Sequence, residues 1–357
     1  MVQLQENSIA SYEVDGNSAK NGEPIINGEH HIDKNAFSIK TTQFDTDCLT
    51  KSAAKSDALP EADVGLVEQV HALLKSEYEK DPEEFETIYS MAHYEELMNP
   101  DSPNTCWRYL LQRDSNVEMA FELIKSTLAW RKSNRIDEMT AEEMVKDFWL
   151  RAPIGLTGKT RNGNDLIYAI GKNFRKPDST VKQAIRDFIA YLIFNWDRQH
   201  IHDLDQLELV FDVTDTGIRN IDLDFAFWLV SIRDFVPARI KAIYFVGIPF
   251  LIRPMIKLII SWLPERFRRI AYCGTYDELV RANIDDDCIP EEIGGKADSK
   301  WRLAPVNTKW AHEHDSPNAG EIFEKICKAC NFNTSQEHLD KLYKMQLDYE
   351  RSLESQN

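Results

Sequence analysis

Apolar residues recur every three or four positions in a long section of the chain that begins at Val64. Val67 and Val70 continue the pattern, which is interrupted at residues 99–103 and then runs to about residue 150. This spacing places apolar side chains on one face of an α-helix, whereas Asn and Pro end helices. Residues 64–150 are therefore predicted to form an all-helical module.

After residue 150, short apolar runs alternate with helical patterns. The runs are typical of buried strands and comprise residues 166–170, 207–211, 242–246 and, as a weaker candidate, 270–273. Strands separated by helices favour a mostly parallel sheet, in which each helix crosses over between strands. Residues 151–296 are therefore predicted to form an α/β domain.

The two ends of the chain have a different composition. Residues 1–60 are rich in Asn, Ser, Thr, Asp, Lys and Gly and contain few large apolar side chains. Such a segment cannot bury enough surface to offset the entropy lost on ordering, so we expect a disordered tail. Residues 297–357 contain a polar connector and two amphipathic helices. Their apolar stripes need a surface to pack on, which is either the domain or a partner protein.

Charge and hydropathy argue against several classes of protein. The 357 residues include 42 Lys and Arg against 59 Asp and Glu, a formal net charge of −17 that disfavours binding to nucleic-acid phosphates. No stretch approaches the roughly 20 apolar residues that span a bilayer. The N-terminus also lacks the basic and then apolar layout of a secretory signal. We therefore expect a cytoplasmic protein.

Motifs for catalysis, nucleotide binding and metal binding are weak or incomplete. Residues 158–160 end like a P-loop, but Pro153 stands where the loop needs its first glycine. Cys327 and Cys330 form a close pair without the second pair that a zinc site requires. The polar residues 200–205 fit the end of a helix better than a metal site. We therefore expect no enzyme, no catalytic residues, no metal and no cofactor other than a bound ligand.

The most unusual region spans residues 239–269, where strongly apolar runs are flanked by basic residues. Seven Lys and Arg face one acid, Glu265, so this segment carries +6 and the remainder of the chain −23. An apolar and basic segment in an acidic protein indicates contact with anionic lipid headgroups, worth roughly 1 kcal/mol for each Lys or Arg. A buried helix with charges at its fringe would give the same pattern, and the residues alone leave both interpretations open.

Several motifs, in the right order, resemble the CRAL-TRIO family of lipid-binding proteins. They lie at residues 107–111, 129–132, 161–168, 236–250, 262–265 and 289–295. The run 210–225 is most similar to the CRAL-TRIO part of motile-sperm-domain-containing proteins. Those relatives also carry a β-sandwich domain and a membrane anchor, neither of which we expect here.

The resemblance implies a sheet floor and a helical gate that enclose a deep apolar pocket for one lipid. On this basis the predicted pocket residues are Tyr168, Phe211, Phe245, Phe250, Met255, Ile256 and Ile259. The predicted contacts to headgroups or membranes are Arg239, Lys241, Arg253 and Lys257. Phosphatidylinositol-transfer relatives have a lysine where this chain has Ala242. Arg239 and Lys241 resemble instead the basic pair with which tocopherol-transfer relatives meet phosphoinositides.

The sequence therefore predicts a protein without enzymatic activity that binds a hydrophobic lipid, such as a phospholipid, and transfers it between membranes. Its partners would be the lipid and, transiently and peripherally, an anionic membrane surface, but not nucleic acid. The alternative is a signalling adaptor with a vestigial pocket, in which the C-terminal helices recruit a protein. A lipid that co-purifies would favour the carrier. A partner lost when residues 318–357 are removed would favour the adaptor.

Overall fold

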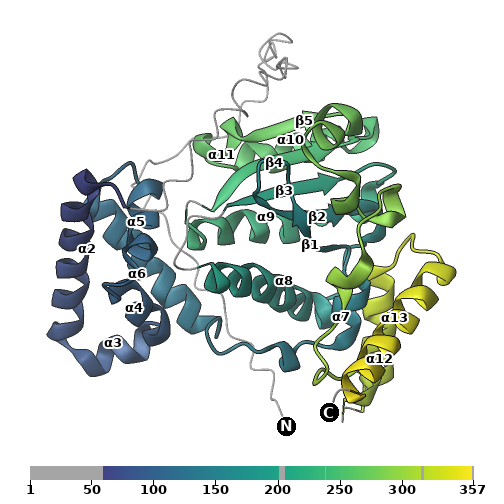
Figure 1. Ribbon diagram of the computed structural model, residues 1–357, viewed down its shortest axis with the longest axis horizontal. Coiled ribbons are helices and arrows are strands. Elements are labelled where there is room, and N and C mark those ends of the chain that lie inside the picture. The colour runs from purple at the N-terminus through teal and green to yellow at the C-terminus, as the bar shows by residue number, and fades with distance from the viewer. Residues whose placement is uncertain (1–58, 201–205, 238, 315–316, 356–357) are drawn as a thin grey trace, which may run out of the picture. The chain divides into compact units, whose positions relative to one another are not determined.

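The N-terminal part of the protein is helical, as predicted (Figure 1). The computed structural model describes residues 59–200, 206–237, 239–314 and 317–355. Its first helices are α2 Glu61–Lys80, α3 Pro82–Ile88, α4 Met91–Met98, α5 Pro103–Gln112, α6 Val117–Ser133 and α7 Lys146–Arg151. The predicted disordered tail lies outside the described residues except for positions 59 and 60, and so does the polar run 201–205.

Short-range sequence signals explain where three of these helices begin. Asp81, Ser90 and Asn116 are N-caps, because each side chain accepts a hydrogen bond from a backbone N–H group in the first turn of its helix. The helices then pack around one apolar core, which contains Val70, Leu74, Leu110, Ile124 and Leu128. The three- and four-residue spacing of these side chains is the pattern visible in the sequence.

A five-stranded sheet follows, with the strands in chain order. They are β1 Ile154–Lys159, β2 Asp165–Ile170, β3 Leu207–Asp212, β4 Ile240–Val246 and β5 Ala271–Gly274. β1 pairs with β2 in antiparallel fashion, and all other pairs are parallel. The four predicted strands are present, whereas β1 was not predicted. Its two glycines and the irregular register after Leu156 hide the alternation of a strand.

Helices connect the parallel strands and cover one face of the sheet (Figure 1). They are α8 Ser179–Gln199, α9 Leu223–Ile232, α10 Arg253–Trp262 and α11 Glu265–Arg269. The opposite face packs against residues 277–293 in a separate apolar core that includes Tyr168, Val210 and Tyr244. Because side chains alternate along a strand, neighbouring residues of one strand contribute to different cores.

The two C-terminal helices, α12 Ala319–Cys330 and α13 Gln336–Glu354, pack on the domain. α12 contacts α7 and α8, and α13 contacts α7. Ile326 is buried in the core shared with α8, and Leu339 and Leu342 are buried as well. Their apolar stripes are thus covered mainly by this chain, which answers the question that the sequence left open.

Buried ion pairs connect the helical module to the rest of the protein and hold its own helices together. Asp197 of α8 accepts hydrogen bonds from Arg108 Nη1 of α5 at 2.5 Å and from Arg239 Nε at 2.8 Å. Within the module, Asp137 accepts hydrogen bonds from Arg131 Nε at 3.0 Å and from the Ser90 hydroxyl at 2.5 Å. Each of these carboxylates bridges segments that are far apart in the sequence.

The Asp137 pair predicts a specific response of stability to acid. Burial alone would raise the pKa of Asp137, but the hydrogen bonds and charge of Arg131 outweigh burial and lower the pKa from 3.8 to about 2. The charged form therefore stabilises the fold by about 2 kcal/mol above pH 4. This stabilisation is lost as the pH falls from 4 towards 2.

Urea unfolding of wild type and Asp137→Asn across this pH range checks the prediction. We expect the two unfolding free energies to differ by about 2 kcal/mol at pH 6 and to converge near pH 2. Glu138→Gln changes an exposed neighbour and should show no such convergence. A difference between wild type and Asp137→Asn that does not depend on pH would contradict the assignment.

Candidate functional site

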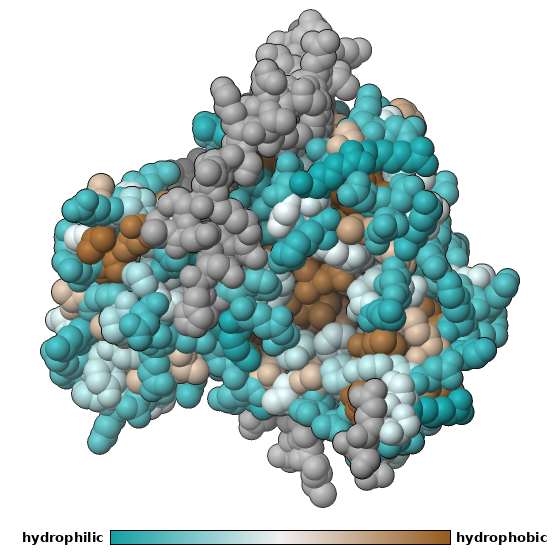
Figure 2. Space-filling model, in the orientation of Figure 1, coloured by the Kyte–Doolittle hydropathy of each residue, from teal (hydrophilic) through white to brown (hydrophobic). Residues whose placement is uncertain are grey.

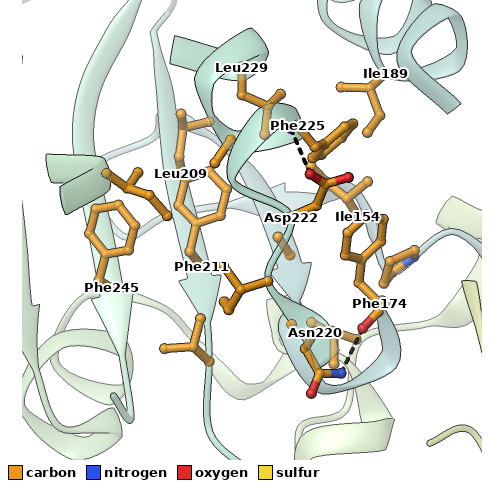
Figure 3. Close-up of a pocket in the computed structure, with 18 of the residues that line it drawn as sticks. Ile154, Phe174, Ile189, Leu209, Phe211, Asn220, Asp222, Phe225, Leu229 and Phe245 are labelled. Carbon is orange, nitrogen blue, oxygen red and sulfur yellow. Dashed lines mark hydrogen bonds between the residues drawn. The ribbon is translucent and has the colours of Figure 1, made fainter. Parts of the chain in front are cut away.

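An apolar cavity lies between one face of the sheet and the helices that cover it (Figure 3). Its volume is about 210 Å³, and its lining side chains are almost all apolar. They come from β1 to β4, from α7 to α11 and, through Cys330, from α12. Apolar side chains also gather in a recess between the sheet and α8 on the surface seen in Figure 2.

The floor of the cavity is formed by alternate residues of the parallel strands. Leu209 and Phe211 of β3 and Ile243 and Phe245 of β4 line it. Phe211 is in register with Phe245, and their rings stack with centroids 5.3 Å apart. The aromatic pair follows directly from strand register, since paired residues of neighbouring strands point to the same face.

Four of the seven predicted pocket residues line this cavity: Phe211, Phe245, Ile256 and Ile259. Tyr168 does not, because it points to the opposite face of the sheet and its hydroxyl donates to Asp212 Oδ2 at 2.9 Å. Its neighbour Ala169 faces the cavity instead. The prediction for Tyr168 is therefore wrong by one residue, since adjacent residues of a strand point to opposite faces of the sheet.

The other two predicted pocket residues, Phe250 and Met255, do not line the cavity. Phe250 is 85% exposed in the short turn before α10. Met255 precedes Ile256 on α10 and is partly buried, but it is not among the cavity-lining residues. On a helix, adjacent residues point about 100° apart, so only Ile256 and Ile259 of α10 reach the cavity.

The helical wall of the cavity was not singled out from the sequence. It includes Ile185, Phe188 and Ile189 of α8 and Phe225 and Leu229 of α9. The sequence pattern predicts that these residues are buried on one face of a helix. However, an apolar side chain that lines a cavity has the same spacing as one that packs in a filled core. No sequence signal separates the two.

The predicted headgroup contact at Arg239 is corrected by the structure. Its side chain is 1% exposed, is bound to Asp197 and lies over the ring of Trp196. It is therefore a structural ion pair that no membrane headgroup can reach in this conformation. Lys241, in contrast, is exposed because it is the extra residue of a β-bulge: Leu207 pairs with Ile240, and Glu208 pairs with Ala242. Arg253 and Lys257 are exposed on α10.

A different arginine, Arg233, lies in the cavity lining and has two further arginines nearby. Arg233, at the end of α9, lines the cavity and stands 5.6 Å from the ring of Phe267. Burial lowers the pKa of Arg233 and that of Arg266, and the charge of Arg113 adds to this shift in both. Asp234 opposes the shift in Arg233, and Asp114 and Asp234 oppose it in Arg266. Arg113 follows α5, Arg233 follows α9 and Arg266 lies in α11, and these three residues are the arginine cluster below. The acids Asp114 and Asp234 lie close to them.

Polar side chains also enter the cavity lining near the start of α9 (Figure 3). The Asn220 amide donates to the carbonyl oxygens of Phe174 at 2.6 Å and Lys172 at 3.1 Å, so it holds two loops together. Asp222 Oδ1 accepts from the backbone N–H groups of Asp224 and Phe225 and caps α9. Asp222 and Arg233 therefore mark the two ends of one cavity-lining helix.

The surface beside the cavity is apolar around the start of α10. Phe250 and Leu251 are 85% and 63% exposed, and Leu258 on α10 is also exposed. Arg253 and Lys257 lie on the same helix. In the described part of the chain, no helix is long and apolar enough to cross a membrane. Nor do any three His, Cys, Asp or Glu side chains among the described residues form a group that could hold a metal ion.

Comparison with known proteins identifies a domain in this chain. Residues 152–295 match the model of the CRAL/TRIO domain. A CRAL-TRIO domain-containing protein of Caenorhabditis elegans is 24% identical over 226 residues, which cover 56% of this chain and 54% of that protein. Patellin-4 of Arabidopsis thaliana is 36% identical over 63 residues, 18% of this chain and 11% of its own length. The chain thus spans about half the length of the nematode relative and much less of the patellin.

A crystal structure of Sfh5 aligns with a TM-score of 0.47 and 15% identity over 74% of this chain and 97% of that chain. The closer resemblance to motile-sperm-domain-containing proteins stays a prediction. The CRAL/TRIO family is known for binding and transferring lipids, and its members are generally not enzymes. The matched residues include all five strands and the helices α8 to α11 that enclose the cavity. This chain therefore contains a CRAL/TRIO domain at residues 152–295.

Proposed function

We propose that this protein binds one lipid in the apolar cavity and carries it between membranes without chemical change. The observation that carries the proposal is the cavity itself, whose lining is almost entirely apolar. Transfer of apolar lipid surface from water into such a lining is favourable by about 25 cal/mol for each Å² covered. The gate would be α10, because Ile256 and Ile259 face the cavity while Leu258 faces outward.

The same helix supports docking on an anionic membrane. Phe250 and Leu251 are apolar and exposed, and Arg253 and Lys257 can meet lipid phosphates beside them. A bilayer that buries these apolar side chains would stabilise an open position of α10 and shift the population towards it. Docking, opening of the gate and exchange of the lipid would then follow in this order.

The arginine cluster supports recognition of an anionic headgroup at the gate end of the cavity. Arg233 Nε is buried, and no hydrogen-bond acceptor reaches it within the described ranges. A phosphate group there would accept charge-assisted hydrogen bonds from guanidinium groups, which bind phosphate with high geometric specificity. We therefore propose that an anionic group of a lipid, such as a phosphate, can be bound beside Arg233.

Native mass spectrometry of the purified protein, followed by identification of the extracted lipid, tests the proposed function. One lipid per chain would support the carrier and name its cargo. A protein that is empty and takes up no lipid from mixed liposomes would contradict it, and the adaptor hypothesis would then lead.

Filling the cavity should reduce lipid binding without unfolding the protein. Ala169→Phe places a ring on the cavity floor, where Ala169 is only partly buried and has open space above it. We expect the bound lipid per chain to fall several-fold, because the added ring competes for the same volume. Ala169→Val adds much less volume and is the control. Equal lipid occupancy in wild type and Ala169→Phe would place the lipid elsewhere.

A further inference from the structure

The carboxylate of Asp222 is a buried hydrogen-bond acceptor at the end of the cavity opposite the arginine cluster. Its side chain has no exposed area. Oδ1 is used as the cap of α9, whereas Oδ2 receives no hydrogen bond from any residue that the structure describes. The ammonium group of Lys182 lies 3.7 Å from Oδ2, beyond hydrogen-bond distance, and contacts Asp224 more closely. One oxygen of a buried carboxylate is therefore left without a donor.

The surroundings of this carboxylate are apolar towards the cavity, whereas Lys182 lies 3.7 Å from Oδ2. Asp222 lines the cavity together with Phe225 and Leu229 of α9, and Figure 3 shows it beside Phe225 and Ile154. The ion pair with Lys182 offsets the charge, but a buried oxygen that receives no hydrogen bond is still costly, which is why buried polar groups are nearly always satisfied. A donor that enters the cavity with a ligand would remove this cost.

The two ends of α9 give the cavity opposite charges. Asp222 precedes the helix and Arg233 follows it, and both line the cavity. Ten helical residues separate them, a rise of about 15 Å at 1.5 Å per residue. Lys182 and Asp234 each offset part of these charges, but a negative group is still less favourable beside Asp222 than beside Arg233. The cavity can therefore orient a long ligand.

We propose that Asp222 Oδ2 accepts a hydrogen bond from a hydroxyl group of the bound lipid and selects lipids with an alcohol at this end. This inference rests on the proposed lipid-binding function and deepens it. The chemistry is that of a neutral alcohol on an apolar skeleton, which a sterol or a long straight chain can supply. A phosphate or free carboxylate does not fit this end, because it brings a second negative charge and no proton to donate.

Binding of matched lipid pairs to the full chain tests this proposal. Each pair consists of an alcohol and its O-methyl ether: cholesterol and cholesteryl methyl ether, and hexadecanol and hexadecyl methyl ether. We expect the wild-type protein to bind one alcohol about tenfold or more tightly than its ether, since the ether cannot donate to a charged acceptor. The pair that shows the preference identifies the skeleton.

The variant Asp222→Asn assigns the preference to this residue. Asparagine also caps helices and has nearly the same volume, so α9 should keep its start. We expect the preference for the alcohol to fall to about twofold or less, while binding of the ether is unchanged. Asp178→Asn exchanges the N-cap of α8, which lies outside the cavity lining, and should keep the wild-type preference.

The outcomes separate this proposal from the carrier function. Equal binding of alcohols and ethers by wild type would overturn the role of Asp222 and leave the carrier function intact, and this arm needs no variant to fold. A preference that survives in Asp222→Asn would also overturn it. If wild type binds none of the four probes but takes up a lipid from liposomes, only the role of Asp222 is overturned. If it binds neither the probes nor any lipid from liposomes, the carrier function is overturned as well.

Discussion

Replacing Phe250 and Leu251 together by aspartate is expected to lower transfer of lipid between anionic vesicles at least about 100-fold. Burying one large apolar side chain is worth about 1.5–3 kcal/mol, so losing two removes at least about 3 kcal/mol of docking energy. Both side chains are exposed in the described structure, so the exchange should cost little stability. Vesicle co-sedimentation and a fluorescence transfer assay measure the effect, and thermal unfolding checks the fold.

The control for this variant is Leu347→Asp, the same type of exchange at an exposed apolar position of α13. Transfer by this control should equal that of wild type. The double variant should also retain its bound lipid, because neither Phe250 nor Leu251 lines the cavity. Wild-type transfer by the double variant would move the docking surface away from α10, and loss of bound lipid would give these residues a role inside the gate.

The layers of the fold could be predicted from residue pattern alone. Runs of mostly apolar residues predicted β2, β3 and β4, because strands buried on both faces are largely apolar. Because both faces of such a strand are apolar, the sequence does not indicate to which face each residue points. Tyr168 and Ala169 are equally compatible with the cavity in sequence, and only the register with β3 decides between them. The strand could therefore be predicted from the sequence, whereas the residues of the strand that line the cavity could be identified only from the structure.

The charged residues show a second limit of the sequence. The basic excess around residues 239–269 was visible, but charge counts cannot separate buried from exposed side chains. Arg239 is buried because its partner Asp197 lies on α8, 42 positions earlier in the chain. Arg233 and Asp222 were missed for a related reason. Each is a charged residue at one end of an apolar helix, and its position at the cavity depends on how α9 packs.

Asp197→Ala is expected to lower the free energy of unfolding by about 3–5 kcal/mol. Burial alone would raise the pKa of Asp197, but the charges of Arg108 and Arg239 hold it far below its ordinary value. Without this carboxylate, two guanidinium groups that are each 1% exposed lose their shared counterion. Urea unfolding at pH 7 measures the loss. Asp277→Ala breaks an exposed ion pair with Arg281 and should change stability little.

The variant in which all three charges are replaced separates the cost of unpaired charge from a general loss of packing. Asp197→Leu, Arg108→Met and Arg239→Met together should recover most of the stability lost in Asp197→Ala, because apolar side chains of similar volume can replace a buried ionic cluster. A loss below about 1 kcal/mol in Asp197→Ala would contradict burial of the triad. Arg108 belongs to α5 and Arg239 precedes β4. That result would therefore also mean that these charges do not hold the helical module on the CRAL/TRIO domain.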